Sequence, residues 1–97
     1  MSVTLKRATN GIHKFMAIFP DGKVVRFGRK GFSDYTLHKD PERMKRYLTR
    51  HRRRENWTRS GAKTAGFWSR WLLWSSPSLS GAAAKTSRIL GKKIVLK

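Results

Sequence analysis

Residues 14–27 read KFMAIFPDGKVVRF, and this stretch carries the clearest structural signal in the chain. Two apolar runs flank Pro20-Asp21-Gly22. Proline presets φ at the first turn position and glycine accepts a positive φ, so this tripeptide is typical of a tight turn. Alternation places one set of apolar side chains on a single strand face: Phe15, Ala17 and Phe19. The stretch therefore predicts a β-hairpin, with strands at residues 14–19 and 24–27.

The flanking residues extend this β region. Val3 to Lys6 forms a candidate short strand, and Asn10-Gly11 is a turn signal. After the hairpin, residues 28–31 form a basic loop bounded by glycines. Residues 35–37 are expected to form a further strand or an extended lead-in to the next element. Residues 1–31 are thus interpreted as the β-hairpin region.

A helix is expected to begin at Asp40-Pro41-Glu42 and to end near Arg54. Aspartate can cap the helix, proline suits its first position and glutamate complements its positive N-terminus. Apolar residues recur at i, i+3, i+4 and i+7, which predicts a stripe that faces the sheet. Its members are Met44, Tyr47, Leu48 and His51.

Two more helices are expected, at residues 62–74 and 79–90, with Gly91 ending the second. The residues of the tail, 92–97, either add an edge strand or extend freely. Residues 40–91 are the helical region and residues 92–97 the basic tail of one basic domain spanning residues 1–97. The predicted fold class is α+β, with a small antiparallel β-sheet from the N-terminal third packed against two to three α-helices.

Four tryptophans lie in the second half of the chain. Trp68, Trp71 and Trp74 recur at helical spacing, and large aromatic side chains at such spacing usually fill the core of a small domain. We therefore expect these three in the core. Trp57 lies in a polar connection, and both a core position and a contact surface remain open for it.

The charge of the chain indicates its class of partner. Lys and Arg number 23 against five Asp and Glu, a formal net charge of +18 in 97 residues. Such a body repels itself until a polyanion or counterions neutralise it. The candidate polyanions are nucleic acid, an acidic protein and an anionic membrane surface.

The densest basic run is Arg50-His51-Arg52-Arg53-Arg54. Guanidinium groups bind phosphate oxygens through two parallel hydrogen bonds, so we interpret this run as the main anion contact. Asp34 is expected to pair with an arginine of the helix predicted between Asp40 and Arg54. The full set of candidate anion-binding residues is Arg46, Arg50, Arg52, Arg53, Arg54, Arg29, Lys30, Lys92 and Lys93.

The sequence gives no support for catalysis, a cofactor or a metal site. Cysteine is absent, and the three histidines are scattered without a set of nearby carboxylates. Clustered carboxylates for Mg²⁺ and a Ser-His-acid set are also missing. The prediction is a protein that is not an enzyme. The N-terminus lacks the apolar core of a signal peptide, so secretion is not expected.

Several motifs resemble those of a known family. The stretches are GFSDYTLHKD at residues 31–40, RY at 46–47, RH at 50–51, ENW at 55–57, TAG at 64–66 and SRWLLW at 69–74, before Pro77. Together they resemble a family of small basic proteins of unknown function from nucleocytoplasmic large double-stranded DNA viruses. The resemblance covers about half the chain. It implies a viral origin and an ordered domain, but no catalytic site.

Two hypotheses for function follow. The first is a virion-associated structural protein that binds DNA by neutralising phosphates, without sequence specificity. The alternative is a minor capsid or membrane-apposed protein that bridges acidic capsid subunits or anionic lipid. Either places the protein in the virion, and in the host cytoplasm or nucleus during infection. Oligomeric state is open.

Overall fold

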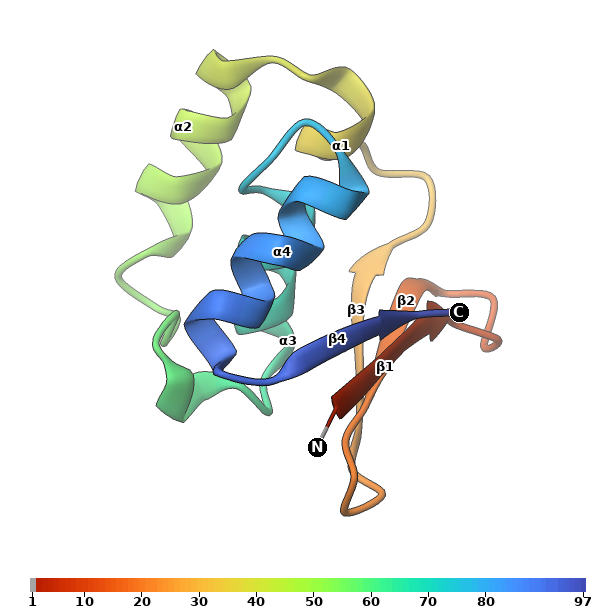
Figure 1. The fold of residues 1–97 in the computed structure, drawn as a ribbon. Helices are drawn as coiled ribbons and strands as arrows, with labels where there is room; N and C mark the ends of the chain where they lie inside the picture. The colour runs from red at the N-terminus through yellow and green to blue at the C-terminus, as the bar shows by residue number, and fades with distance from the viewer. Residues whose placement is uncertain (1) are drawn as a thin grey trace.

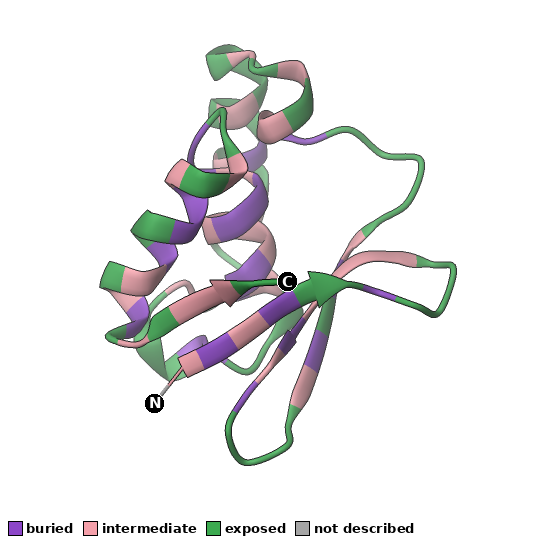
Figure 2. Cartoon of the chain, turned by 45° about the vertical axis from the view of Figure 1, so that its right-hand side comes forward, coloured by how far each residue is buried: buried purple, intermediate pink, exposed green. Residues whose placement is uncertain are grey.

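The computed structural model describes residues 2–97 and shows an α+β fold, which confirms the predicted class. A four-stranded sheet has the order β3-β2-β1-β4. Its helices gather on one side of the sheet (Figures 1 and 2). The elements in chain order are β1 Ser2–Arg7, β2 His13–Ile18, β3 Val24–Arg29, α1 Tyr35–His38, α2 Pro41–His51, η1 Arg59–Gly61, α3 Ala65–Trp68, η2 Ser69–Leu73, α4 Leu79–Leu90 and β4 Lys93–Leu96.

The predicted hairpin is confirmed. Strand β2 pairs antiparallel with β3, with Ala17 opposite Val25. In the connecting turn, Gly22 adopts a φ of 92° and its N–H donates to Phe19 O at 3.0 Å. The Asp21 carboxylate accepts from Lys23 N at 2.9 Å, so each residue of the turn has a local role.

The sheet is mixed and not purely antiparallel. Strand β1 pairs antiparallel with β2, and β4 runs parallel to β1 at the edge, with Val3 opposite Ile94. The tail therefore forms an edge strand, one of the two alternatives that the sequence left open. Parallel strands need a long connection, and here residues 8–92 connect the two strands, with α4 leading into β4.

One core lies between the sheet and the helices. Strands β1, β2 and β3 contribute alternating buried side chains, and α3, η2 and α4 cover them. Trp68 is fully buried at the centre, edge-on to Phe19 and stacked on Phe27, with ring centroids 6.0 and 5.8 Å apart. Helix α4, expected at these residues, packs through the small side chains of Ala82, Ala83 and Thr86.

The tryptophan helix differs from its predicted form. The helix begins at Ala65 and not at residue 62, because Thr64 caps α3. A short 3₁₀ turn, η1, precedes it, and residues 69–73 form a π-helical turn. The wider turn brings Leu72 and Leu73 into the core side by side. Trp71 and Trp74 consequently lie half-buried at the core edge, so the expectation of a full core position is confirmed only for Trp68.

Residues 35–38 form the short helix α1, so the expected strand or extended lead-in is wrong. Asp34 caps this helix by accepting a hydrogen bond from Thr36 N at 2.9 Å. Helix α2 follows and is capped by Asp40, as expected. It ends at His51, three residues earlier than predicted, because the chain turns at 52–54 and brings Glu55 back against His51.

Helix α2 projects from the body of the protein, and most of its surface is exposed (Figure 2). Its predicted stripe does not pack on the sheet. Tyr47 stacks on Trp74 at the end of η2, with ring centroids 4.3 Å apart and planes 2° apart. A groove that contains arginines of both β3 and α2 lies between the two elements, and their like charges oppose closer packing.

Candidate nucleic-acid interface

The carboxylates of this protein are all engaged within the chain. Asp40 caps α2, and Asp34 caps α1 while also pairing with a lysine. The ion pairs are Lys14–Asp34 at 2.5 Å, Lys63–Asp21 at 2.5 Å, Lys45–Glu42 at 3.7 Å and His51–Glu55 at 3.1 Å. None of these pairs involves an arginine. Throughout residues 2–97, the guanidinium groups therefore have no carboxylate within 4.0 Å.

Asp34 lies elsewhere than the sequence predicted. Its side chain is buried and accepts a hydrogen bond from Lys14 Nζ at 2.5 Å, as well as bonds from the backbone N–H and the hydroxyl of Thr36. The expected pair with an arginine of α2 is wrong. Its buried position beside β2 suits a lysine from the neighbouring strand and leaves the arginines of α2 in solvent.

The predicted arginine run lies on α2 and just beyond it. Arg46 and Arg50 are exposed on the helix, and Arg52, Arg53 and Arg54 are exposed in the turn that follows. The helix is held against the body by the stack of His51, Tyr47 and Trp74. Burial, and secondarily the charge of Glu55, raises the pKa of Tyr47 well above its usual range, so this phenol stays neutral.

Glu55 fixes the end of the arginine run. Its carboxylate accepts hydrogen bonds from His51 Nδ1 at 3.1 Å and from Trp57 Nε1 at 2.8 Å. Gly66 allows this approach, since a Cβ there would lie 2.9 Å from the Glu55 carboxyl carbon. The turn that carries three arginines is thus anchored at both ends.

The structure brings arginines from separate parts of the chain to one groove, which we call the α2–β3 groove. It has a volume of about 780 Å³ and lies between strand β3 and helix α2. Arg26 and Arg29 line it from β3, and Arg50 lines it from α2. Phe27, Leu73 and Trp74 supply apolar lining. The two carboxylates at its wall, Asp34 and Glu55, are those already engaged by Lys14, His51 and Trp57.

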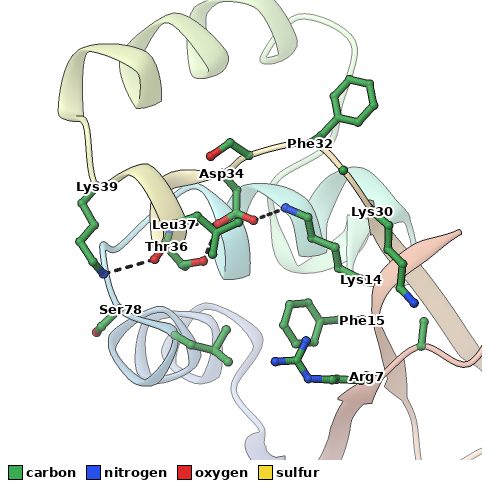
Figure 3. Close-up of a pocket in the computed structure, with 14 residues that line it drawn as sticks. Arg7, Lys14, Phe15, Lys30, Phe32, Asp34, Thr36, Leu37, Lys39 and Ser78 are labelled. Atoms are coloured by element: carbon green, nitrogen blue, oxygen red, sulfur yellow. Dashed lines mark hydrogen bonds and ion pairs between the residues drawn. The ribbon is translucent and has the colours of Figure 1, made fainter. Parts of the chain in front are cut away.

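A second hollow, of about 800 Å³, adjoins the groove across residues 32–34 (Figure 3). Phe15 and Leu79 give it apolar walls, and Leu37 stands at its margin with 63% of its surface exposed. In Figure 3 the Lys14 ammonium points at Asp34 and the Lys39 ammonium at the end of α1. The cations around this hollow are Arg7, Lys14, Lys30 and Lys39.

The predicted set is therefore divided among several places. Arg29 and Arg50 meet at the α2–β3 groove, and Lys30 lines the adjoining hollow. Lys92 is half-buried and lines a third hollow with Arg59 and Lys63, and Lys93 begins strand β4. The lysines of the tail do not share a cavity with the arginines of α2.

Arg70 has a structural role. Its guanidinium lies 4.2 Å from the ring centroid of Trp71 and 5.4 Å from that of Trp57, and Nη1 donates to Trp74 O at 2.9 Å. Burial lowers the pKa of this arginine, although it remains charged. Trp57, whose position the sequence left open, is half-buried and belongs to this cluster.

Two residues of the groove were missed by the sequence analysis. Arg26 could have been found, because it alternates with the buried Val25 and Phe27 and so must face away from the core. Phe32 carried no such signal, since an aromatic residue in a loop is ordinarily expected to be buried. Its side chain is 63% exposed, and the Arg29 guanidinium lies 5.6 Å from its ring centroid.

His38, the last residue of α1, gives a prediction for pH. Asp40 N donates to His38 Nδ1 at 2.9 Å, so the neutral ring carries its proton on the buried Nε2. Burial, helped by the charge of Arg43 and opposed by Asp40 and Asp34, lowers the pKa of His38 below 6.5. The unfolded chain then binds the proton first as the pH falls, so the stability that the neutral ring provides is present above pH 6.5 and declines below it.

We expect the melting temperature to fall between about pH 7 and about pH 5.5, above the range in which carboxylates titrate. The control is His38→Asn, whose Oδ1 can still accept from Asp40 N but does not titrate. His13 and His51 remain in both proteins, so the difference between the two pH profiles reports on His38. If the melting temperatures of both proteins changed with pH in the same way, the stabilising role of the neutral His38 ring would be contradicted.

Residues 2–97 contain neither a metal-binding cluster nor a membrane-spanning helix. No group of three or more His, Asp or Glu side chains is arranged to hold a metal ion. In the same range no helix has the length and apolar character needed to cross a bilayer.

Comparison with known protein families gives a match. A model described as "Family of unknown function (DUF5754)" matches residues 3–51, which span the first three strands, α1 and α2. No curated protein and no solved structure matches the chain.

Proposed function

The chain belongs to that family of unknown function, and we propose that it is a basic structural protein that binds DNA without sequence specificity by neutralising phosphates. One observation supports this above the others. The five side-chain carboxylates are engaged by lysines, by histidine or by helix ends, while among residues 2–97 no arginine has a carboxylate partner. The positive charge is thus left free on the side chain that binds phosphate best.

The arrangement of these arginines supports backbone contact over base reading. Arg52, Arg53 and Arg54 lie in a turn that follows α2, and they extend the charge of the helix along its exposed side. A sequence-specific protein inserts side chains of one helix or β-ribbon into a groove of the duplex, where they contact base edges. Contacts to phosphates fix the position of a protein on the duplex but carry no sequence information. A virion location, with DNA as the packaged partner, is part of the proposal.

The alternative is a minor capsid or membrane-apposed protein, and one observation favours it. Phe32 and Leu37 are large apolar side chains that are each 63% exposed close to Lys30 and Lys39. Apolar groups beside cations suit an anionic lipid surface or an acidic protein. Cross-linking within the particle, to DNA or to shell proteins, separates the two functions.

The direct test is a salt titration with duplexes of unrelated sequence. If about five phosphates are neutralised, log K should fall with log salt at a slope of about −4 to −5, equally for each duplex. Fluorescence anisotropy between about 50 and 200 mM salt measures this slope. Absence of binding at the lowest salt, or binding insensitive to salt, would remove DNA as the main partner.

A further inference from the structure

We propose that the α2–β3 groove binds a single strand of nucleic acid, with an unpaired base stacked on Phe32 and its flanking phosphates on Arg26, Arg29 and Arg50. This inference rests on the proposed nucleic-acid function and extends it to a second form of the ligand. The site adjoins the exposed arginine run and shares Arg50 with it.

The size of the groove favours a single strand. Its volume of about 780 Å³ lies within the range of about 300–1,000 Å³ typical of small-ligand sites. Strand β3 lines one side and helix α2 the other. A hollow of this volume between two elements suits one nucleotide of a single strand, whereas the exposed arginines outside it can reach the phosphates of a duplex.

The charge of the groove favours a polyanion. Arg26, Arg29 and Arg50 contribute guanidinium groups without carboxylate partners. The two carboxylates at its wall repel an incoming phosphate less than unpaired carboxylates would. Asp34 is paired with Lys14, and Glu55 accepts hydrogen bonds from His51 and Trp57. The lining is therefore strongly cationic, and its arginines come from two elements that would face a strand from both sides.

Phe32 offers an exposed aromatic ring on which an unpaired base can stack, a contact that the paired bases of a duplex cannot make. The side chain lines the groove, is 63% exposed and has no aromatic partner among residues 2–97 within stacking distance. In Figure 3 its ring points away from the neighbouring hollow and from the Lys14–Asp34 pair. An exposed aromatic ring beside cations is the usual platform for an unpaired base, whose faces are covered by its neighbours in a duplex. Arg29, 5.6 Å from the ring centroid, is placed to hold the adjoining phosphate.

The backbone that carries Phe32 is fixed on both sides. Phe32 N donates to Arg29 O at 3.2 Å, and Lys30 N donates to Ile12 O at 2.9 Å. Two residues further on, Asp34 is buried and holds Lys14. The aromatic ring is thus presented from an anchored loop, which lowers the entropy lost when a base stacks on it.

The experiment compares three labelled ligands of about 12 nucleotides per strand: oligo(dT), an abasic strand with the same phosphates, and a blunt-ended duplex without unpaired bases. The wild-type protein should bind oligo(dT) more tightly than the abasic strand. Phe32→Ala should weaken oligo(dT) binding by roughly 5- to 150-fold, the value of one base–aromatic stack. The same variant should bind the abasic strand and the duplex as the wild type does.

Leu37→Ala is the matched control, because Leu37 is apolar, equally exposed and outside the groove. It should bind all three ligands as the wild type does. The inference would be overturned if both variants lost the same affinity for oligo(dT). It would also be overturned if Phe32→Ala bound oligo(dT) as tightly as the wild type does. Duplex binding by the wild type tests the proposed function separately, so a failure here with an intact duplex salt slope removes only the single-strand site.

Discussion

Replacing Trp68 with alanine is expected to lower the free energy of unfolding by about 3–5 kcal/mol. The side chain has no exposed surface, and its indole contacts Phe19 just after β2, Phe27 of β3 and Phe67 of α3. Domains of this kind are stable by only about 5–15 kcal/mol, so the loss is a large share of the total. Urea denaturation followed by circular dichroism measures it.

A second variant separates packing from hydrogen bonding at this position. Trp68 Nε1 donates to Ala62 O at 2.7 Å, and Ala62 is buried. Trp68→Phe keeps most of the ring but leaves that carbonyl without its donor, which should cost about 1–3 kcal/mol. Trp57→Ala, at the half-buried edge, should cost less than Trp68→Ala. A stable Trp68→Ala protein would show that the core does not depend on this ring.

The parts of the fold that were predicted correctly are those that local chemistry determines. The hairpin depends on a turn whose three residues lie next to one another, and α4 depends on spacing within twelve residues and on Gly91 at its end. Asp40 and Pro41 begin α2 as expected. In each case the contacts that form the element lie within a few residues of it.

The errors occurred where distant residues decide the structure. Residues 35–38 become helical because buried Asp34 caps them, and that aspartate is held by Lys14 from 20 residues away. The parallel pairing of β4 with β1 joins the two ends of the chain. Neither contact has a signature in the local sequence.

In the candidate site, too, the sequence predicts the features that depend on neighbouring residues but not those that depend on tertiary contacts. The basic run of α2 is visible in the sequence and is exposed in the structure. Its partners across the groove, Arg26 and Arg29, are brought near Arg50 only by tertiary structure, since Tyr47 packs on Trp74 and not on the sheet. The amphipathic stripe specified which side of the helix is buried but not which element buries it.

Changing Arg50, Arg52, Arg53 and Arg54 to glutamine is expected to weaken duplex binding and to make its salt dependence shallower. Each lost phosphate contact removes about 0.9 from the slope of log K against log salt, so the slope should fall in magnitude by up to about 3–4. Glutamine has a helix propensity close to that of arginine, and all four side chains are exposed without carboxylate partners. The melting temperature should therefore stay the same or rise, because like charges are removed.

The matched control removes four exposed cations elsewhere, Lys6, Lys23, Arg88 and Lys97, again as glutamine. Both variants lose the same net charge, so a general electrostatic effect predicts the same slope for both. A contact surface at the end of α2 predicts a slope near the wild-type value for the control alone. If the arginine variant unfolds, these residues stabilise the fold. The conclusion that their guanidinium groups have no stabilising partners within the protein is then wrong. If it folds and keeps the original slope, the phosphates bind elsewhere, and Arg29, Lys30, Lys92 and Lys93 become the next positions to change.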